Sequence, residues 1–398
     1  MTGTIDVAVI GAGPAGLVAA LLAHAGGLSV ALVAPRASPQ DQRTVAMLGV
    51  SVDILAEVGV WDEIEPTVAP LVTMRIVDAT RRLVRAPLVE FRASEIGRAA
   101  FGYNVPNSAF IGALERAAEM AGIRRIDGFA RGIEPGGDHV VVDAGTAGTV
   151  SARLVGAADG RHSPAREAAG IGVRRWTYPQ TALVANIAHA LPHHDVSTEF
   201  HTETGPFTLV PLPGRRSAVV CVVKPAEAER LFALADADLA RLFEQKSHFL
   251  VGAITMDGPR QRFALSGQTA ERFAAKRIAL IGEAAHVFPP IGAQGLNLSL
   301  RDAAIFASVA AGFRRDSGCA EALGDYQLRR SADILSRTTA VDALNRTLLT
   351  DFLPIQVARG IGLFALDRLP ALKRFAMRQA LAPHLQADFS QRQPSRPG

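Results

Sequence analysis

Residues 5–34 read IDVAVIGAGPAGLVAALLAHAGGLSVALVA, and this stretch decides the fold. A run rich in valine and isoleucine (5–10) precedes a glycine turn, a helix-forming segment (15–25) and a second strand-forming run (28–33). This order predicts a βαβ unit, which opens an α/β domain with a parallel sheet. Asp6 and the lack of a basic start argue against a signal peptide or a membrane span.

The glycine turn carries the pattern G-x-G-x-x-G at Gly11, Gly13 and Gly16. After a strand and before a helix, these glycines allow a tight turn, a close backbone approach to a pyrophosphate and close helix packing. Ala15 lies in the same turn, where the helix N-terminus faces phosphate charge. We therefore predict dinucleotide binding through Gly11, Gly13, Ala15 and Gly16.

One element of the dinucleotide fingerprint is missing. An acidic residue should end the second strand and bind the adenosine ribose, but Ala34 stands in that region. Either a loop residue such as Arg36, Gln40 or Asp41 replaces the acid, or adenosine binding is weaker than usual. Both explanations stay open at this stage.

Composition narrows the class of protein. A length of 398 residues predicts roughly two to three domains. Hydrophobic residues make up 48% and charged residues 20%, which indicates a folded chain. The net charge of +4 is spread over scattered arginines, so we expect no nucleic-acid partner. Cys221 and Cys319 lack disulfide or zinc spacing, so we expect no metal and a reducing compartment.

The rest of the chain alternates between strand and helix patterns. Residues 71–91 and 173–265 contain short strand-forming pieces, with a helical insertion at 227–245, and predict a second, mainly antiparallel sheet. Helical patterns are expected at 45–64, 107–121, 296–314 and 324–385, the last with breaks at Pro354, Pro370 and Pro383.

Two further motifs carry chemistry. The first, GAADGRHSPAR at 156–166, predicts a strand-end turn and a helix with Ser163 as N-cap and Pro164 at its first position. The second is IGEAAHVFPPIGAQGLNL at 281–298, where a strand ends in glycine and a carboxylate follows. A helix that starts near Gly295 would point its N–H groups and positive dipole end at an anion.

The order and spacing of the three motifs resemble those of single-component flavoprotein aromatic hydroxylases of the para-hydroxybenzoate hydroxylase fold. The resemblance covers nearly the whole chain and implies FAD as the cofactor. Glu283 stands where that family usually has aspartate. Contacts to FAD are implied for Arg43, Asn107, Asp159, Gly160, Gly282, Glu283, Pro290, Gly292, Gly295, Leu296 and Asn297. The backbone of Pro290 and Gly292 is implied to form the catalytic loop beside flavin and substrate.

A narrower resemblance, to the ubiquinone-biosynthesis hydroxylases, rests on the stretches 43–48, 59–61, 102–105, 205–207 and 294–303. It implies that a C4a-hydroperoxyflavin hydroxylates the aromatic ring of a polyprenylated phenol. Because there is a single nucleotide fingerprint, electrons are expected from transiently bound NAD(P)H or from a separate reductase.

The implied fold class is α/β: a Rossmann-like FAD-binding domain with an inserted, mainly antiparallel β-sheet substrate domain and C-terminal helices. The expected segments are 1–67, 99–172 and 266–323 for FAD, 68–98 and 173–265 for substrate, 324–385 for the helical region, and a flexible tail at 386–398. We expect the pocket between the flavin loop and the second sheet, lined by Tyr178, Phe207, Leu209 and Phe288.

The expected partner is a lipophilic phenolic or quinone precursor, and the expected location is the cytoplasm. Membership of a quinone-biosynthesis complex is left open. For the basic residues Lys373, Arg374 and Arg378, two alternatives stay open: peripheral contact with the inner face of the cytoplasmic membrane, or a solvated basic face. The oligomeric state is left open.

Other functions on this fold also stay open: another aromatic hydroxylase, a prenyl reductase, or an inactive flavin-binding subunit that scaffolds a complex. The scaffold hypothesis is motivated by Ala34 and Glu283. A flavin halogenase is disfavoured because Trp61 and Trp176 do not form the W-x-W-x-I-P signature.

Overall fold

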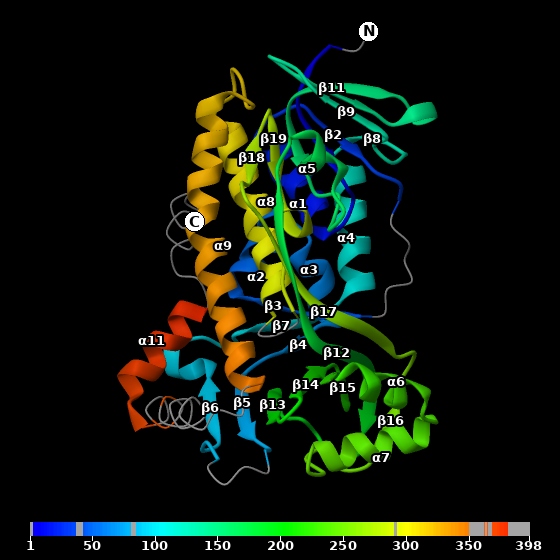
Figure 1. Cartoon of the computed structure of the whole chain (residues 1–398), viewed down its shortest axis with the longest axis vertical. Helices are drawn as coiled ribbons and strands as arrows, with labels where there is room; N and C mark the ends of the chain where they lie inside the picture. The colour runs from blue at the N-terminus through cyan, green and yellow to red at the C-terminus, as the bar shows by residue number, and fades with distance from the viewer. Residues whose placement is uncertain are drawn as a thin grey trace, which may run out of the picture.

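A sheet forms around the strand before the glycine turn, as the βαβ pattern predicts (Figure 1). The computed structural model describes residues 3–36, 43–80, 85–289, 293–349, 362, 364 and 368–380. For residues 336–349 and 379–380 it describes the backbone only. The parallel strands, in spatial order, are β19 (Ile278–Leu280), β11 (Thr149–Ala157), β1 (Ile5–Ile10), β2 (Val30–Val33) and β8 (Arg124–Ile126). Antiparallel neighbours are β9 (Gly132–Pro135), β10 (Val140–Asp143) and β18 (Ala274–Ala275).

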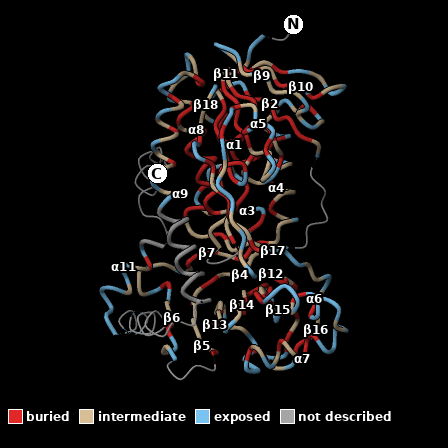
Figure 2. The backbone as a smooth tube through the Cα atoms, in the orientation of Figure 1, coloured by how far each residue is buried: buried red, intermediate tan, exposed pale blue. Residues whose placement is uncertain are grey.

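Helices cover this first sheet and bury its apolar strands. The helices are α1 (Pro14–Ala25), α4 (Asn107–Met120), α8 (Gln294–Gly312) and α9 (Ala320–Leu349). α1 packs on both α4 and α8, and α9 packs on the outer side of α8. Because α8 lies between α1 and α9, it is buried over most of its surface (Figure 2).

The second sheet is mainly antiparallel, as expected. Its strands, in spatial order, are β20 (His286–Val287), β17 (Gln261–Ala270), β12 (Val173–His189), β15 (Arg216–Val223), β14 (Gly205–Leu212), β13 (Val196–Thr202), β5 (Thr73–Asp78) and β6 (Val89–Arg92). β16 (Ile254–Met256) pairs with β12, and the pair β13–β5 is parallel. In place of the expected single helical insertion, the structure has two helices, α6 (Pro225–Ala233) and α7 (Asp236–Lys246). Both cover one face of this sheet.

The expectation of a helix at 45–64 is wrong at its start. Residues Thr44–Leu48 form β3, which pairs with β7 (Gly102–Pro106); β7 also pairs with β4 (Ala69–Pro70). The antiparallel partner satisfies the backbone groups of β3, so tertiary pairing overrides local helix propensity. The helices that follow are α2 (Gly49–Glu57) and α3 (Trp61–Ile64).

Short helical pieces complete the described fold: α5 (Pro164–Ala168), α11 (Pro370–Ala380) and the 3-10 turns at Glu65–Thr67, Ala93–Ile96, Gly145–Ala147 and Gly282–Ala284. The expected break at Pro370 is confirmed: Arg368 is helical, Leu369 is not, and Pro370 begins α11, whose first position needs no N–H. Pro354 and Pro383 lie outside the described residues. Among the described helices, none combines the length and the apolarity that crossing a bilayer requires.

Candidate functional site

The three sequence motifs follow the ends of three adjacent parallel strands. The glycine turn follows β1, the Asp159 turn follows β11, and the Gly282 turn follows β19. The backbone continues the pairing at this edge, because Ala158 N donates to Ile10 O and Ile281 N donates to Ala157 O, both at 2.8 Å. Ligands of open α/β sheets bind at this edge, outside the carboxyl ends of the strands.

Within the glycine turn, two glycines serve packing and one borders open space. Gly11 has φ +105°, and a Cβ on it would lie 2.2 Å from Ala158 O; a Cβ on Gly16 would lie 2.0 Å from Gly11 O. At Gly13, the N-cap of α1, a Cβ would meet nothing within 4 Å. The first turn of α1, which includes Ala15, carries no acidic side chain and Gly13 provides no side-chain cap. The helix dipole there is therefore open to a ligand's negative charge.

At the end of β2, where the ribose-binding acid is missing, two arginines pair with α4. Arg125 Nε donates to Ala34 O at 3.1 Å, and its guanidinium pairs with Glu115. Arg36, one of the expected replacements, pairs with Glu119. The other two, Gln40 and Asp41, lie outside the described residues. No sequence signal linked Arg125 or Glu115 to this strand end.

The Asp159 turn has the predicted cap. Ser163 Oγ accepts a hydrogen bond from Arg166 N at 2.9 Å and Pro164 is the first residue of α5, which confirms this prediction. Asp159 Oδ2 accepts from Ala165 N at 3.0 Å, whereas its buried Oδ1 has no hydrogen-bond partner within the described part of the chain. Burial raises the pKa of Asp159. Gly160 follows with φ +84°, the left-handed region that favours glycine.

The third motif presents one carboxylate from a buried segment. Gly282 has φ +64°, and its N–H donates to Asp302 Oδ2 at 2.9 Å. Glu283 is exposed, although every other residue from 281 to 287 is buried. His286, to which the sequence analysis gave no role, is buried against Asp302. Pro290 and Gly292 lie outside the described residues.

The side chain of Asn297 is fully engaged with protein groups. Its Oδ1 accepts from Leu48 N at 2.8 Å and from Ser51 Oγ at 2.6 Å. Its Nδ2 donates to Ala46 O at 2.8 Å and to Ala293 O at 2.5 Å. An asparagine amide has two donors and an acceptor with two lone pairs. The side chain therefore ties α8 to β3 and α2, and no hydrogen-bonding capacity remains for a ligand.

The start of α8 faces the same region as Glu283. Ala293, its N-cap, has φ +53°, and no acidic residue occupies the first turn. A Cβ on Gly295 would meet nothing within 4 Å, so the backbone there is approachable. Leu296 packs against the core of the first sheet. Asn107 begins α4, and its backbone N–H donates to Arg43 O at 2.9 Å, which joins two of the expected contacts.

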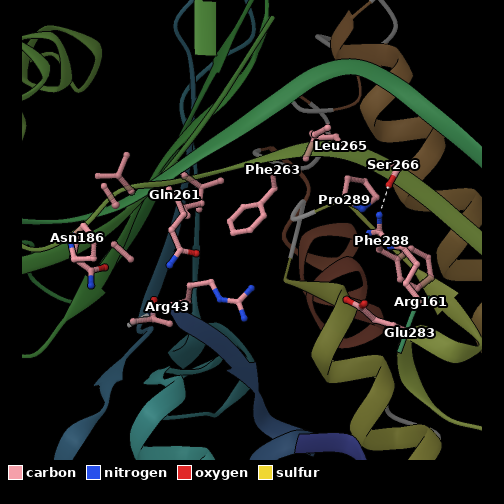
Figure 3. Close-up of a pocket in the computed structure, with 18 residues that line it drawn as sticks. Arg43, Arg161, Asn186, Gln261, Phe263, Leu265, Ser266, Glu283, Phe288 and Pro289 are labelled. Carbon is pink, nitrogen blue, oxygen red and sulfur yellow. Dashed lines mark hydrogen bonds between the residues drawn. The ribbon is translucent and has the colours of Figure 1, made fainter. Parts of the chain in front are cut away.

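A pocket of about 320 Å³ lies between the second and third motifs, which contribute Arg161 and Glu283, and the second sheet (Figure 3). Figure 3 shows the Arg43 guanidinium and the Glu283 carboxylate pointing toward the space beside Phe263 of β17. Arg161 Nη1 donates to Ser266 Oγ at 3.0 Å, and the Arg43 guanidinium carbon lies 5.8 Å from the centre of the Phe263 ring. The remaining lining residues include Val184, Asn186, Ala218, Val220, Gln261, Leu265, Phe288 and Pro289.

Two expected lining residues are on the wrong face of the sheet. Phe207 and Leu209 are buried in the core beneath α6 and α7, where the Phe207 and Phe243 rings are 5.5 Å apart. Tyr178 packs with Val222 and Leu265, and its hydroxyl accepts from Trp176 Nε1 at 2.7 Å. Phe288 does line the pocket, as expected. Alternation along a strand identifies two faces, but the helices of this fold decide which face the pocket uses.

Comparison with known proteins agrees with this geometry. Residues 4–338 match the family model described as FAD binding domain. The chain is 32% identical to the ubiquinone hydroxylase UbiL of Rhodospirillum rubrum, over 94% of this chain and 89% of that protein. It is 28% identical to the 3-demethoxyubiquinol 3-hydroxylase of Escherichia coli, over 94% of this chain and 98% of that protein.

The fold also matches a solved structure. The p-nitrophenol 4-monooxygenase PnpA of Pseudomonas putida superposes with a TM-score of 0.76 at 18% identity, over 99% of this chain and 100% of PnpA. The predicted α/β fold class is therefore confirmed, and so are the FAD cofactor and a flavin-dependent aromatic monooxygenase activity. This chain belongs to the FAD-binding-domain family, in its group of ubiquinone-biosynthesis hydroxylases.

Proposed function

We propose that this chain hydroxylates the aromatic ring of a polyprenylated phenol in ubiquinone biosynthesis, with FAD held at the carboxyl ends of β1, β11 and β19. The observation that carries the proposal is that three separate motifs converge on one edge of a parallel sheet beside a pocket. The FAD-binding domain then comprises 1–67, 99–172 and 266–323, and the substrate domain comprises 68–98 and 173–265.

The adenosine side of FAD is assigned to the glycine turn. The N–H groups of Ala15 and Gly16 bind the pyrophosphate at the N-terminus of α1, and the open space at Gly13 admits it. Gly11 and Gly16 hold the turn closed by close backbone packing. The buried Oδ1 of Asp159 is an acceptor of the kind that a cofactor hydroxyl would satisfy.

The flavin side is assigned to the Gly282 turn and to the start of α8. Glu283 presents its carboxylate to the ribityl hydroxyls, while the N–H groups of Gly295 and Leu296 face the flavin ring. Bound FAD supplies the chemistry that activates O₂ and transfers one oxygen atom. Arg43 and Asn107 are the remaining assigned contacts. Asn297 acts indirectly, because its side chain ties α8 to β3 and α2. Pro290 and Gly292 remain assigned by resemblance.

The substrate ring is assigned to the pocket of about 320 Å³. Val184, Val220 and Leu265 form an apolar wall, which orients a phenol ring and excludes water from the reaction. Arg43 and Arg161 place positive charge at the same site. Electrons come from transiently bound NAD(P)H or from a separate reductase.

A membrane contact suits a substrate with a long apolar tail. In α11 and the residue before it, Leu369, Leu372 and Phe375 follow helical spacing and are 53%, 42% and 60% exposed. The helix is held to the rest of the chain by the buried Met377 and by Lys373, which pairs with Glu95 at 2.9 Å. Apolar side chains flanked by basic ones are typical of helices at an anionic lipid surface. We therefore place the protein in the cytoplasm, with peripheral contact at the inner face of the membrane.

Deleting the gene and analysing the accumulated lipids by mass spectrometry tests this function. The expected result is a prenylated phenol that lacks one hydroxyl group and disappears on complementation. Unchanged quinone levels would rule out the ubiquinone role. A precursor with extra prenyl unsaturation would instead indicate a prenyl reductase. Purified protein that retains FAD but forms no hydroxylated product, although quinone synthesis requires the gene, would indicate a flavin-binding scaffold.

A further inference from the structure

A wholly buried ionic cluster lies behind Glu283. The side chains of Asp302 on α8, Arg330 on α9 and His286 on β20 each have 0% exposure. Asp302 Oδ1 accepts from Arg330 Nε at 2.6 Å, and Asp302 Oδ2 accepts from His286 Nε2 at 2.6 Å. Such a cluster is costly to desolvate, so it stabilises the fold only if its geometry is held closely.

Asp302 forms hydrogen bonds to residues on both sides of Glu283. Its Oδ2 accepts from Gly282 N as well as from His286, so one oxygen atom fixes the residue before Glu283 and a residue three positions after it. Between these two anchors, Glu283 has the single exposed side chain and reaches into the pocket. The cluster thus controls the backbone from which this carboxylate projects.

The cluster is also fixed from α9. Arg330 Nη1 donates to Asp333 Oδ2 at 2.9 Å, and Arg301 Nη1 donates to Asp333 Oδ1 at 3.2 Å. Burial opposes ionisation of Asp302, but Arg330 and His286 hold its pKa below the usual value. Two arginines, Arg330 and Arg301, thus pair with the two aspartates of the cluster, Asp302 and Asp333, so the charges of these four side chains balance.

We propose that Asp302, acting through His286 and Arg330, is the positioning residue that holds the Glu283 carboxylate toward FAD. This inference rests on the proposed role of Glu283 as a cofactor contact. Glutamate has one more rotatable bond than the aspartate that the family usually carries, so its carboxylate reaches one geometry only if its backbone is fixed. The Asp302 anchors supply that fixed backbone.

A double-mutant cycle between positions 283 and 286 tests the proposal. The variants are Glu283→Gln, His286→Leu and both together, and the measurement is the Kd of FAD from the quenching of its fluorescence. Glu283→Gln should weaken FAD binding about 10-fold in the wild-type background, the size of one charge-assisted hydrogen bond. With His286→Leu already present, it should weaken binding less than about 2-fold, because the carboxylate is no longer held.

A conservative replacement and a matched control separate positioning from folding. The amide introduced by His286→Gln can still donate from its Nε2 to Asp302, so this variant should restore most of the affinity and of the effect of Glu283→Gln. The control is His189→Leu, because His189 is also buried and has two hydrogen bonds, to Leu191 O and Ser217 Oγ, but neither bond goes to the Asp302 cluster. It should lower stability to urea without changing the effect of Glu283→Gln.

The outcomes separate the two proposals. Additive losses from His286→Leu and Glu283→Gln would overturn the positioning role while leaving Glu283 as a cofactor contact. If Glu283→Gln alone leaves the Kd of FAD unchanged, the assignment of Glu283 fails and the positioning role fails with it. A shift of the flavin reduction potential that His286→Leu causes and His286→Gln reverses would further support positioning.

Discussion

Asn297 Oδ1 accepts a hydrogen bond from Leu48 N at 2.8 Å, so the first turn of α8 is joined directly to the end of β3. The resemblance implied that Asn297 contacts FAD, yet all four hydrogen bonds of its side chain go to protein groups. Its contribution to the site is therefore to hold the N-terminus of α8, whose N–H groups are the proposed contacts.

Asn297→Ala should lower the free energy of unfolding of the apoprotein by about 2–4 kcal/mol, because buried backbone groups lose their partners. Urea unfolding followed by circular dichroism measures this loss. The control is Asn104→Ala, since Asn104 is equally buried but donates to Pro211 O at 2.9 Å, away from α8. An Asn297→Ala protein with unchanged stability and weakened FAD binding would point to direct cofactor contact instead.

Gly13→Ala should mainly weaken FAD binding, whereas Gly16→Ala should mainly destabilise the apoprotein. A methyl group on Gly13 meets nothing within 4 Å, so the apoprotein should lose no more than about 1 kcal/mol, the cost of alanine as an N-cap, while FAD affinity falls at least ~10-fold. A methyl group on Gly16 collides with Gly11 O, so Gly16→Ala should destabilise the apoprotein itself. Thermal unfolding and FAD titration on both variants measure this contrast. Unchanged FAD binding by Gly13→Ala would remove the pyrophosphate from this turn.

Local patterns were enough to predict the central strands of the first sheet, β1, β2, β11 and β19, because glycine spacing and runs of apolar residues are set by neighbours in the chain. They failed where a distant partner decides the outcome. Residues 45–48 became a strand because β7 pairs with them, and Phe207 turned away from the pocket because α7 covers that face. The contact between Asp302 and Arg330 joins two helices, and no sequence motif links these two residues.

Asp159→Asn should make the apoprotein more stable at pH 8 while weakening FAD binding. Burial raises the pKa of Asp159, so the folded chain favours the protonated form, and this contribution is lost as the pH rises through the folded-state pKa. Asparagine stays neutral throughout, so its advantage should shrink as the pH falls toward about 4. Urea unfolding between these pH values measures the difference. A difference that does not change with pH would show that Asp159 ionises normally.

Filling the pocket should stop turnover without displacing the cofactor. Val220 lies on the apolar wall, so Val220→Phe takes up space that the substrate ring needs. We expect quinone synthesis in a complemented deletion strain to fall at least ~10-fold, a loss of about 1.4 kcal/mol in transition-state binding. The purified variant should keep its flavin absorbance. Val220→Ile is the matched control and should retain most of the activity; equal loss in both variants would indicate damage to the sheet.

Charged substitutions on α11 should abolish membrane binding and leave the flavin site intact. Leu372→Asp with Phe375→Asp removes two exposed apolar contacts and adds negative charge beside Arg374. Each insertion of such a side chain into lipid is worth about 1.5–3 kcal/mol, so flotation with vesicles of phosphatidylglycerol and phosphatidylcholine should fall to background. Phe129→Asp serves as the control, because Phe129 is 74% exposed but lies beside the first sheet.

Because the basic residues contribute through charge, wild-type binding should also weaken in neutral vesicles. Equal flotation of the wild-type protein and the α11 double variant would exclude this helix as the membrane contact.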